Sequence, residues 1–169
     1  GFIGSHIVDA YINSGHEVSV IDNLSTGNKN NLNPKAKFYQ ADIREDISAL
    51  IKEINPEVIN HHAAQIDVRV SVANPAFDAG ANIIGTLNVI EAGVKNRLKK
   101  IIFASTGGAI YGEQDCFPAD ELHPTRPLSP YGVAKLACEK YLYYYKHNFG
   151  LDYIALRYAR TETGDVHVL

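Results

Sequence analysis

The chain has 169 residues, a net charge of -3 at pH 7 and 46% hydrophobic residues, which is enough for one domain with a sizeable core. The charge is close to balanced without a long basic run, which argues against a nucleic-acid-binding protein, and no stretch approaches the ~18 apolar residues of a membrane span. Two cysteines are too few for a disulfide framework and the adjacent His61 and His62 lack partners at metal-ligand spacing, so we expect a cytoplasmic protein without a metal site.

Helical patterns and apolar runs alternate along the chain. Residues 2–14 carry Ile3, Ile7 and Ala10 at helical spacing, and Gly15 ends this helix. The strands that follow are short and apolar throughout, which is typical of a parallel sheet covered on both faces. In chain order the sequence predicts strands at 18–21 and 38–40, a helix at 47–54, a strand at 58–61, a helix at 75–95, a strand at 101–104, a helix at 130–149 and a strand at 153–156. We therefore expect an α/β fold with a Rossmann-like, doubly wound parallel sheet.

Two glycines, Gly1 and Gly4, stand at the start of the first predicted helix. Backbone N–H groups at such a helix start can hold a pyrophosphate. Asp22 follows the next strand at close to the ~20-residue distance that separates a glycine-rich turn from a ribose-binding acid. A carboxylate there accepts hydrogen bonds from the ribose and repels a 2′-phosphate, so the pattern favours NAD over NADP. The alternative is that Asp22 only caps the turn that follows it.

In this motif a strand precedes the glycine-rich turn. We therefore expect the sheet to lack its first strand, whose place is between the strands ending at Ile21 and His61. Residues 1–159 are expected to form an NAD-binding Rossmann-like domain that is incomplete at its N-terminus. Residues 160–169 are expected to be a divergent tail, with the substrate-binding part absent, and we expect these 169 residues alone neither to fold stably nor to catalyse.

The start of the helix predicted at 130–149 carries a pair of reactive side chains. Ser129 is a good N-cap and Pro130 suits the first helical position. Tyr131 and Lys135 are then four residues apart and project from the same face. An ammonium close to a phenol lowers its pKa from about 10, so such a pair can remove a proton from a sugar hydroxyl while a hydride leaves the same carbon. The alternative is an ordinary amphipathic face with a snorkelling lysine.

At these motifs the chain resembles the extended short-chain dehydrogenases/reductases, and among them the UDP-glucose 4-epimerases of the NAD-dependent epimerase/dehydratase family. The resemblance runs from Gly1 to about Ala159. The matching segments are Gly-Phe-Ile-Gly-Ser-His at 1–6, Asp-Asn-Leu-Ser at 22–25, Ala-Asp-Ile-Arg at 41–44, His-Ala-Ala-Gln at 62–65, Asn-Ile-Ile-Gly-Thr at 82–86, Ser-Thr-Gly-Gly-Ala-Ile-Tyr-Gly at 105–112, Pro-Leu-Ser-Pro-Tyr-Gly-Val-Ala-Lys at 127–135 and Leu-Arg-Tyr-Ala at 156–159.

The resemblance implies which residues hold the NAD cofactor. The residues on the pyrophosphate are Gly1, Phe2, Ile3 and Gly4, and those on the adenosine ribose and adenine are Asp22, Asn23, Asp42 and Ile43. Ala63, Ala64 and Gln65 line the cofactor cleft, with Asn82 nearby, and the residues on the nicotinamide side are Tyr131, Lys135 and Tyr158.

The resemblance also implies catalytic roles. Tyr131 is the acid/base and Lys135 holds the nicotinamide ribose. The family's catalytic hydroxyl falls nearest to Thr106, with Ser105 as the next choice, because the position five residues before Gly112 is a glycine here. The chain also departs from the family after Ala159, where Asn-x-Tyr-Gly-Pro is replaced by Arg-Thr-Glu-Thr-Gly at 160–164.

The reaction that the resemblance implies is NAD-dependent epimerisation of a UDP-sugar through a 4-keto intermediate. A nucleotide-sugar dehydratase or decarboxylase shares the first oxidation, but dehydratases carry an Asp-Glu pair where Gly107 and Gly108 stand here. A non-catalytic truncated remnant is the third alternative. The resemblance further implies a homodimer paired through the helices at 75–95 and 130–149, for which we expect Tyr141, Leu142 and Tyr145 to provide anchors.

Overall fold

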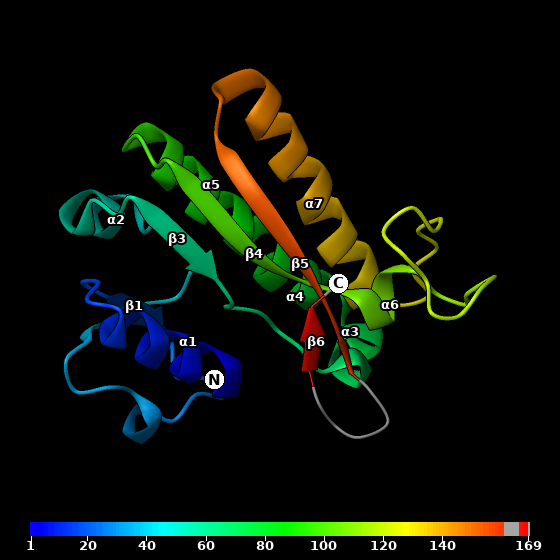
Figure 1. The fold of residues 1–169 in the computed structure, drawn as a ribbon, viewed down its shortest axis with the longest axis horizontal. Coiled ribbons are helices and arrows are strands. Elements are labelled where there is room, and N and C mark those ends of the chain that lie inside the picture. Colours follow the sequence, from blue (N-terminus) through cyan, green and yellow to red (C-terminus); the bar gives the residue numbers. More distant parts are fainter. Residues whose placement is uncertain (161–165, 169) are drawn as a thin grey trace.

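The computed structural model describes residues 1–160 and 166–168 of the chain, and it has the parallel α/β architecture that the sequence predicts (Figure 1). One sheet pairs β1 (Ser19–Asp22) in parallel with β2 (Lys37–Gln40). The second sheet has the order β3-β4-β5-β6, and its first three strands are β3 (Val58–His61), β4 (Lys100–Thr106) and β5 (Asp152–Arg160), all parallel.

A last strand departs from this parallel pattern. β6 (Val166–Val168) pairs antiparallel with the end of β5, so part of the tail expected to be divergent extends the sheet. Residues 161–165 and 169 of that tail lie outside the described residues.

The helices reproduce the predicted elements and add shorter ones. The predicted ones are α1 (Phe2–Asn13), α2 (Ser48–Ile54) and α7 (Pro130–Phe149). The helix expected at 75–95 is a succession of α4 (Pro75–Ala79), the π-helix η2 (Gly80–Ile84) and α5 (Gly85–Lys95). Three short elements were not predicted: a 3₁₀ turn, η1 (Lys29–Asn31), and the helices α3 (Val68–Ala73) and α6 (Gly107–Ile110).

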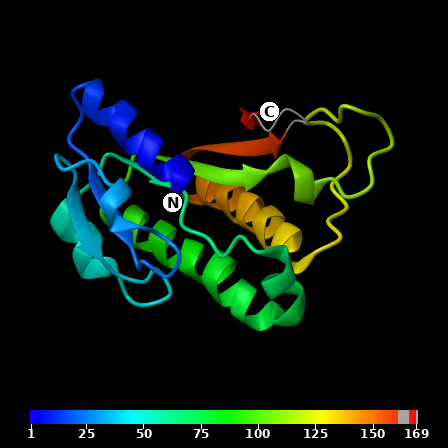
Figure 2. The ribbon, with the colours of Figure 1, turned by 90° about the horizontal axis from the view of Figure 1, so that it is seen from below.

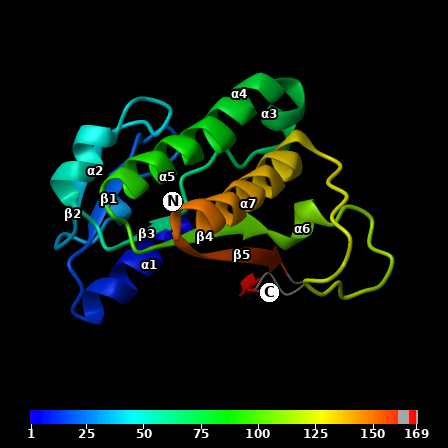
Figure 3. The same ribbon diagram turned by 90° about the horizontal axis from the view of Figure 1, so that it is seen from above.

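The main core lies between the second sheet and the two long helical elements. α5 and α7 run side by side over β4 and β5, as Figure 3 shows from above. Ile101 and Phe103 of β4 are both fully buried because alternate residues of a strand point to the same face. α1 lies on the opposite side of the molecule from α5 and α7 (Figure 2), as a doubly wound fold requires.

Burial in this core corrects one expectation. Leu142 and Tyr145 on α7 are only 0% and 5% exposed and belong to the core cluster. They therefore cannot anchor an interface, because they face the sheet from the inner side of the helix. Tyr141, on the outer side, is 41% exposed.

β1 and β3 belong to different sheets, and among the described residues no ladder joins them. A hydrogen bond of 3.0 Å from the Asn60 amide of β3 to the Tyr11 hydroxyl connects β3 to α1. The strand expected between Ile21 and His61 stays a prediction.

Within 1–160 and 166–168, no helix combines the length and apolar character needed to cross a bilayer, and no group of His, Cys, Asp or Glu side chains is placed to hold a metal ion.

Candidate active site and cofactor-binding edge

The predicted site residues gather where the parallel strands end. Asp22 is the last residue of β1 and Thr106 the last of β4. Thr106 is the register partner of Tyr158 on β5. The segment 63–65 follows β3 after one residue, His62. Since ligands bind parallel sheets at the carboxyl ends of the strands, the topology places these residues where a nucleotide site is expected.

Helix α7 begins as the sequence predicts. The Ser129 hydroxyl accepts a hydrogen bond of 3.1 Å from the Gly132 N–H, and Pro130 occupies the first turn. The Tyr131 N–H, which has no partner within the helix, donates to the Ser71 hydroxyl on α3 at 2.7 Å. Ser71 is fully buried, so α3 fixes the start of α7 and with it the backbone of Tyr131.

Lys135 is buried and does not snorkel. The residue is only 3% exposed, and its ammonium donates to the Ala104 carbonyl of β4 at 2.9 Å. It also lies 4.7 Å from the centroid of the Phe103 ring. Burial lowers the pKa of Lys135 from 10.5 to about 8. The alternative of an ordinary surface lysine is therefore wrong.

The effect expected of Lys135 on Tyr131 is not seen. The pKa of Tyr131 is raised above its ordinary value, first because of burial and second because of the negative charge of Asp78. The ammonium is 5.8 Å from the centroid of the Tyr131 ring and is bonded to Ala104 instead. Burial outweighs any stabilisation of the phenolate, so Tyr131 holds its proton at neutral pH in this structure.

The two candidate hydroxyls differ in their surroundings. The Ser105 hydroxyl is buried and donates to the Glu139 carboxylate at 2.6 Å. The Thr106 oxygen is half-buried and accepts a weaker hydrogen bond of 3.3 Å from the Ala109 N–H, which caps α6. The hydroxyl proton of Ser105 is thus engaged, whereas Thr106 keeps a proton to donate. This geometry favours Thr106.

Tyr158 has a partner that the sequence analysis missed. Its hydroxyl lies 2.9 Å from Nε2 of His62, which directly follows β3. Burial is the main cause that lowers the pKa of His62 to about 4, so the imidazole is neutral at pH 7. The neighbouring His61 points to the other face, where its Nε2 lies 2.9 Å from the Thr86 hydroxyl. The one sign of this role in the sequence was the position of His62 directly after a predicted strand, where site residues of a parallel sheet are expected.

Asn82 is a clamp on the loop after β3. Its side-chain oxygen accepts from the Gln65 N–H and its amide nitrogen donates to the Gln65 carbonyl, both at 2.9 Å. The same amide donates to Asp78 at 3.0 Å, and the Gln65 side chain donates to the same carboxylate oxygen. Asn82 is buried in the π-helix η2, so its amide positions Gln65, and with it the segment containing Ala63 and Ala64.

The edge at β1 carries the predicted ribose acid. One Asp22 oxygen accepts from the Leu24 N–H at 2.7 Å, which is the turn-capping role considered as its alternative. The other lies 3.9 Å from the Gly1 nitrogen, so Asp22 also adjoins the start of α1. That helix has no side-chain cap at its N-terminus, and Phe2 and Gly4 lie in its first turn, next to Ile3.

Asn23 and Asp42 are joined to each other. The Asn23 amide donates to Asp42 at 2.9 Å, and Arg44 donates to both oxygens of the same carboxylate. The Arg44 guanidinium holds the pKa of Asp42 well below its usual range. The Ile43 side chain packs so closely on α5 that a Cβ added at Gly85 would be 2.8 Å from it. Asp42 is thus held by hydrogen bonds to Asn23 and Arg44, and Ile43 is held by packing on α5.

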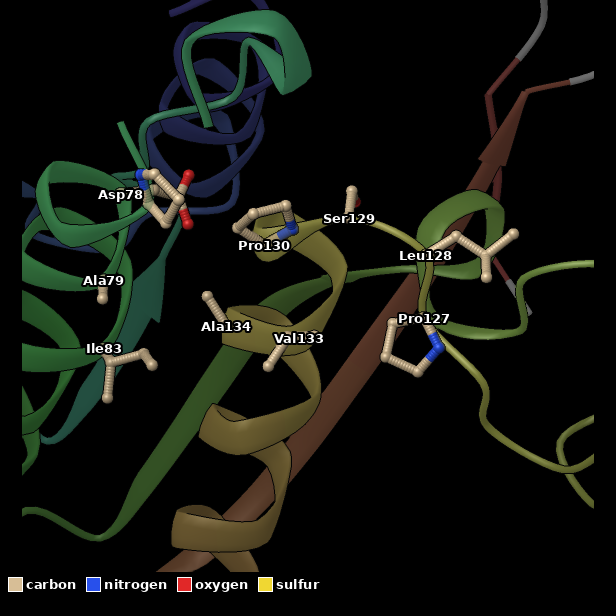
Figure 4. A pocket seen from close by; sticks show the side chains of 10 residues that line it. Asp78, Ala79, Ile83, Pro127, Leu128, Ser129, Pro130, Val133 and Ala134 are labelled. Carbon is tan, nitrogen blue, oxygen red and sulfur yellow. The ribbon is translucent and has the colours of Figure 1, made fainter. Parts of the chain in front are cut away.

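A separate pocket lies between α7 and the succession of α4 and η2. Its volume is about 460 Å³, and no predicted catalytic side chain lines it. Figure 4 shows Val133 and Ala134 of α7 facing Ala79 and Ile83, with the Asp78 carboxylate near Pro130.

The parallel strands, with α1 on one side and α5 and α7 on the other, define an α/β protein of the Rossmann type. Comparison with known proteins identifies the family. Residues 1–163 match the model of the NAD dependent epimerase/dehydratase family, and the chain belongs to that family.

Similar proteins agree with this assignment. The chain is 51% identical over 160 residues to a putative UDP-glucose 4-epimerase of Methanocaldococcus jannaschii, covering 94% of this chain and 52% of that protein. It is 42% identical over 158 residues to UDP-glucose 4-epimerase of Mycolicibacterium smegmatis, covering 90% of this chain and 50% of that protein. The chain thus spans about half the length of these relatives.

Solved structures show the same fold. UDP-glucose 4-epimerase of Thermotoga maritima, solved with UDP-glucose, superposes with a TM-score of 0.90 at 47% identity, over 95% of this chain and 53% of that one. The NAD complex of the Thermus thermophilus enzyme gives a TM-score of 0.90 at 43% identity, over 93% and 51% of the two chains.

Proposed function

We propose that the protein catalyses NAD-dependent 4-epimerisation of a UDP-sugar, of the UDP-glucose/UDP-galactose type. The observation that carries the proposal is the pair of Tyr131 and buried Lys135 on α7, with the Lys135 ammonium bonded to the Ala104 carbonyl, two residues before Thr106 on β4. The similarity to UDP-glucose 4-epimerases, two of them solved with UDP-glucose or with NAD, supports the same conclusion. On this proposal residues 1–159 form the cofactor-binding domain.

The residues present fit a dinucleotide. The first N–H groups of α1 have no side-chain cap, and a Cβ added at Gly4 in the first turn would meet nothing within 4 Å. Free amides at a helix N-terminus, with open space at Gly4, suit a pyrophosphate. The Asp22 carboxylate beside them suits ribose hydroxyls and disfavours a 2′-phosphate, so the fit is to NAD.

The chain's own groups would then move the proton and orient the sugar. Bound NAD supplies reversible hydride transfer at the sugar C4. Tyr131 exchanges a proton with the C4 oxygen, and Thr106 donates a hydrogen bond to the same oxygen. The Lys135 ammonium, held by Ala104, supplies positive charge to the nicotinamide side of the site. The buried neighbours of Lys135 keep this charge away from water. In such a surrounding of low dielectric constant, the charge acts more strongly than it would in water.

The structure offers little to a dehydratase. Elimination of water needs a second acid and base beside the threonine. At that place the chain forms α6, which begins at Gly107 and is capped by Thr106. Neither Gly107 nor Gly108 has a side chain to transfer a proton, so epimerisation is favoured over elimination.

Conversion of UDP-galactose to UDP-glucose tests the proposal. The protein expressed from its complete coding sequence should interconvert the two sugars without added reductant. Tyr131→Phe should lower the rate by a factor on the order of 10²–10⁴, the usual contribution of a positioned acid/base. Tyr143→Phe, an exposed tyrosine on the same helix, is the matched control and should leave the rate unchanged. An inactive wild-type protein that binds no NAD would instead support a non-catalytic remnant.

We further propose a homodimer formed through the outer faces of α4–α5 and α7. Support comes from the exposed apolar side chains on these faces, which include Ile84, Val133, Tyr141, Tyr144 and Phe149. Large exposed apolar and aromatic side chains are typical of interfaces. Sedimentation at micromolar concentration should give a dimer, and a monomer would refute it.

A cytoplasmic location is also part of the proposal. Both cysteines, Cys116 and Cys138, are free thiols, which is the usual state in a reducing compartment. Cell fractionation should recover the protein with the cytosolic marker, and recovery with secreted material would contradict this.

A further inference from the structure

A buried carboxylate links three elements of the proposed site without belonging to the reacting groups. Glu139 is only 9% exposed and lies one helical turn after Lys135 on α7. Its Oε1 accepts from the Ser105 hydroxyl at 2.6 Å and from Nε of Arg157 at 3.0 Å. Its Oε2 accepts from Nη2 of Arg157 at 2.7 Å. Both carboxylate oxygens are thus engaged, in the two-pronged geometry that fixes an arginine most firmly.

Each partner of Glu139 adjoins a residue of the proposed site. Ser105 immediately precedes Thr106 on β4, and Arg157 immediately precedes Tyr158 on β5. Thr106 and Tyr158 are register partners across the sheet. Because strand neighbours are rigidly connected, fixing Ser105 and Arg157 against α7 also fixes Thr106 and Tyr158 relative to Lys135.

The linkage continues into the segment between β4 and α7. Nη1 of Arg157 donates to the Tyr111 hydroxyl at 2.9 Å and to the Glu121 carbonyl at 3.4 Å. The guanidinium carbon lies 5.3 Å from the Tyr111 ring centroid, and Tyr111 is buried. Arg157 therefore also fixes the chain that leads from Thr106 to the start of α7.

Stability alone does not account for this arrangement. Replacing a buried ion pair by apolar side chains of similar volume is often neutral or stabilising, because desolvation offsets the attraction. What a two-pronged pair supplies is a fixed relative position of the elements that carry it. Catalysis is sensitive to such positions, since a displacement of about 1 Å can lower a rate by about 10²-fold.

We propose that Glu139, Arg157 and Ser105 are positioning residues that hold the Tyr131–Lys135 helix in register with Thr106 and Tyr158. This inference rests on the proposed function for its kinetic consequence. It assigns Ser105 a structural partner on α7 and leaves Thr106 as the hydroxyl that touches the substrate.

Kinetics of two variants separate positioning from catalysis by Ser105. Glu139→Gln keeps the shape of the side chain and should lower kcat at least tenfold, with KM changed less than about twofold. Ser105→Ala removes one bond and should lower kcat less than tenfold. It should have no further effect in the Glu139→Gln background, because both act through one linkage. A loss above a hundredfold in Ser105→Ala, or unchanged kcat in Glu139→Gln, would overturn the proposal.

Hydrogen exchange gives a readout that does not depend on activity. In folded Glu139→Gln, amide exchange should accelerate at least tenfold in peptides covering 104–111 and 156–160 and stay unchanged in β1 and β2. Glu53 is an exposed glutamate on α2, and Glu53→Gln is the control. This variant should leave amide exchange unchanged in the peptides covering 104–111 and 156–160. Uniform acceleration, or none, would show a general stability role and refute positioning, even if the wild-type protein proved inactive. If Glu139→Gln does not fold, Arg157→Lys provides the same comparison.

Discussion

The burial of Lys135 has a consequence for stability that can be measured. Its ammonium is shielded from water and has the Ala104 carbonyl as its hydrogen-bond acceptor. Burial lowers the pKa of this lysine from 10.5 to about 8. At about 1.4 kcal/mol for each tenfold change in proton affinity, keeping Lys135 charged costs the folded state about 3 kcal/mol.

The sign of the pH dependence follows from proton linkage. Between pH 8 and pH 10.5 the unfolded chain binds more protons at Lys135 than the folded chain, so stability rises with pH across that window. Below pH 8 both states are protonated and the full cost is present. Lys135→Met removes the charge at similar volume. The free energy of unfolding of the variant should therefore rise relative to the wild type at pH 7, and most of this gain should be lost by pH 10. The Ala104 carbonyl, left without its partner in the variant, lowers the free energy of unfolding of the variant by about 1–3 kcal/mol at every pH.

Urea unfolding of the wild type and Lys135→Met at pH 7 and pH 10 measures this difference, since other titrating groups cancel between the two proteins. The variant's stability relative to the wild type should fall by about 2–3 kcal/mol from pH 7 to pH 10. The same variant should be inactive. A difference that changes by less than about 1 kcal/mol would refute the assignment of Lys135 as a desolvated charge.

Three further predictions concern other parts of the molecule. Asp22→Ala should weaken NAD binding and relax discrimination against NADP in calorimetry, and unchanged affinities for both would remove Asp22 from the site. Asn82→Ala removes three hydrogen bonds from the loop clamp and should lower the free energy of unfolding by about 2–4 kcal/mol in urea, whereas a loss below about 1 kcal/mol would show the clamp to be dispensable. Val133 on α7 is 52% exposed, so Val133→Glu places a charge on the surface of this helix and should convert the proposed dimer to a monomer in sedimentation. A persistent dimer would place the interface elsewhere.

Local patterns predicted the elements that position the site. The apolar run at 101–104 gave β4, and Ser129-Pro130 gave the start of α7. The short helices α3 and α6 were missed because six or four residues carry too little periodicity. β6 was missed because its partner and its tail position are set by tertiary pairing.

Contacts between distant residues were beyond sequence reasoning. Ser105 and Thr106 are adjacent and equally polar, and only the contact with Glu139, far along the chain, distinguishes them. The pKa of Tyr131 was misjudged because spacing reveals Lys135 but not burial. Leu142 and Tyr145 were placed on the wrong side of α7 because the helix has apolar residues on more than one face.

On the proposed function, the hydrogen at the sugar C4 would leave and return as a hydride without exchanging with solvent. Turnover of UDP-galactose in D₂O by the protein expressed from its complete coding sequence distinguishes this epimerisation from elimination. We expect UDP-glucose with no solvent deuterium on carbon, because a hydride does not exchange with water. Loss of water from the sugar, with deuterium on a carbon beside the keto group, would show a dehydratase and refute the proposed epimerisation.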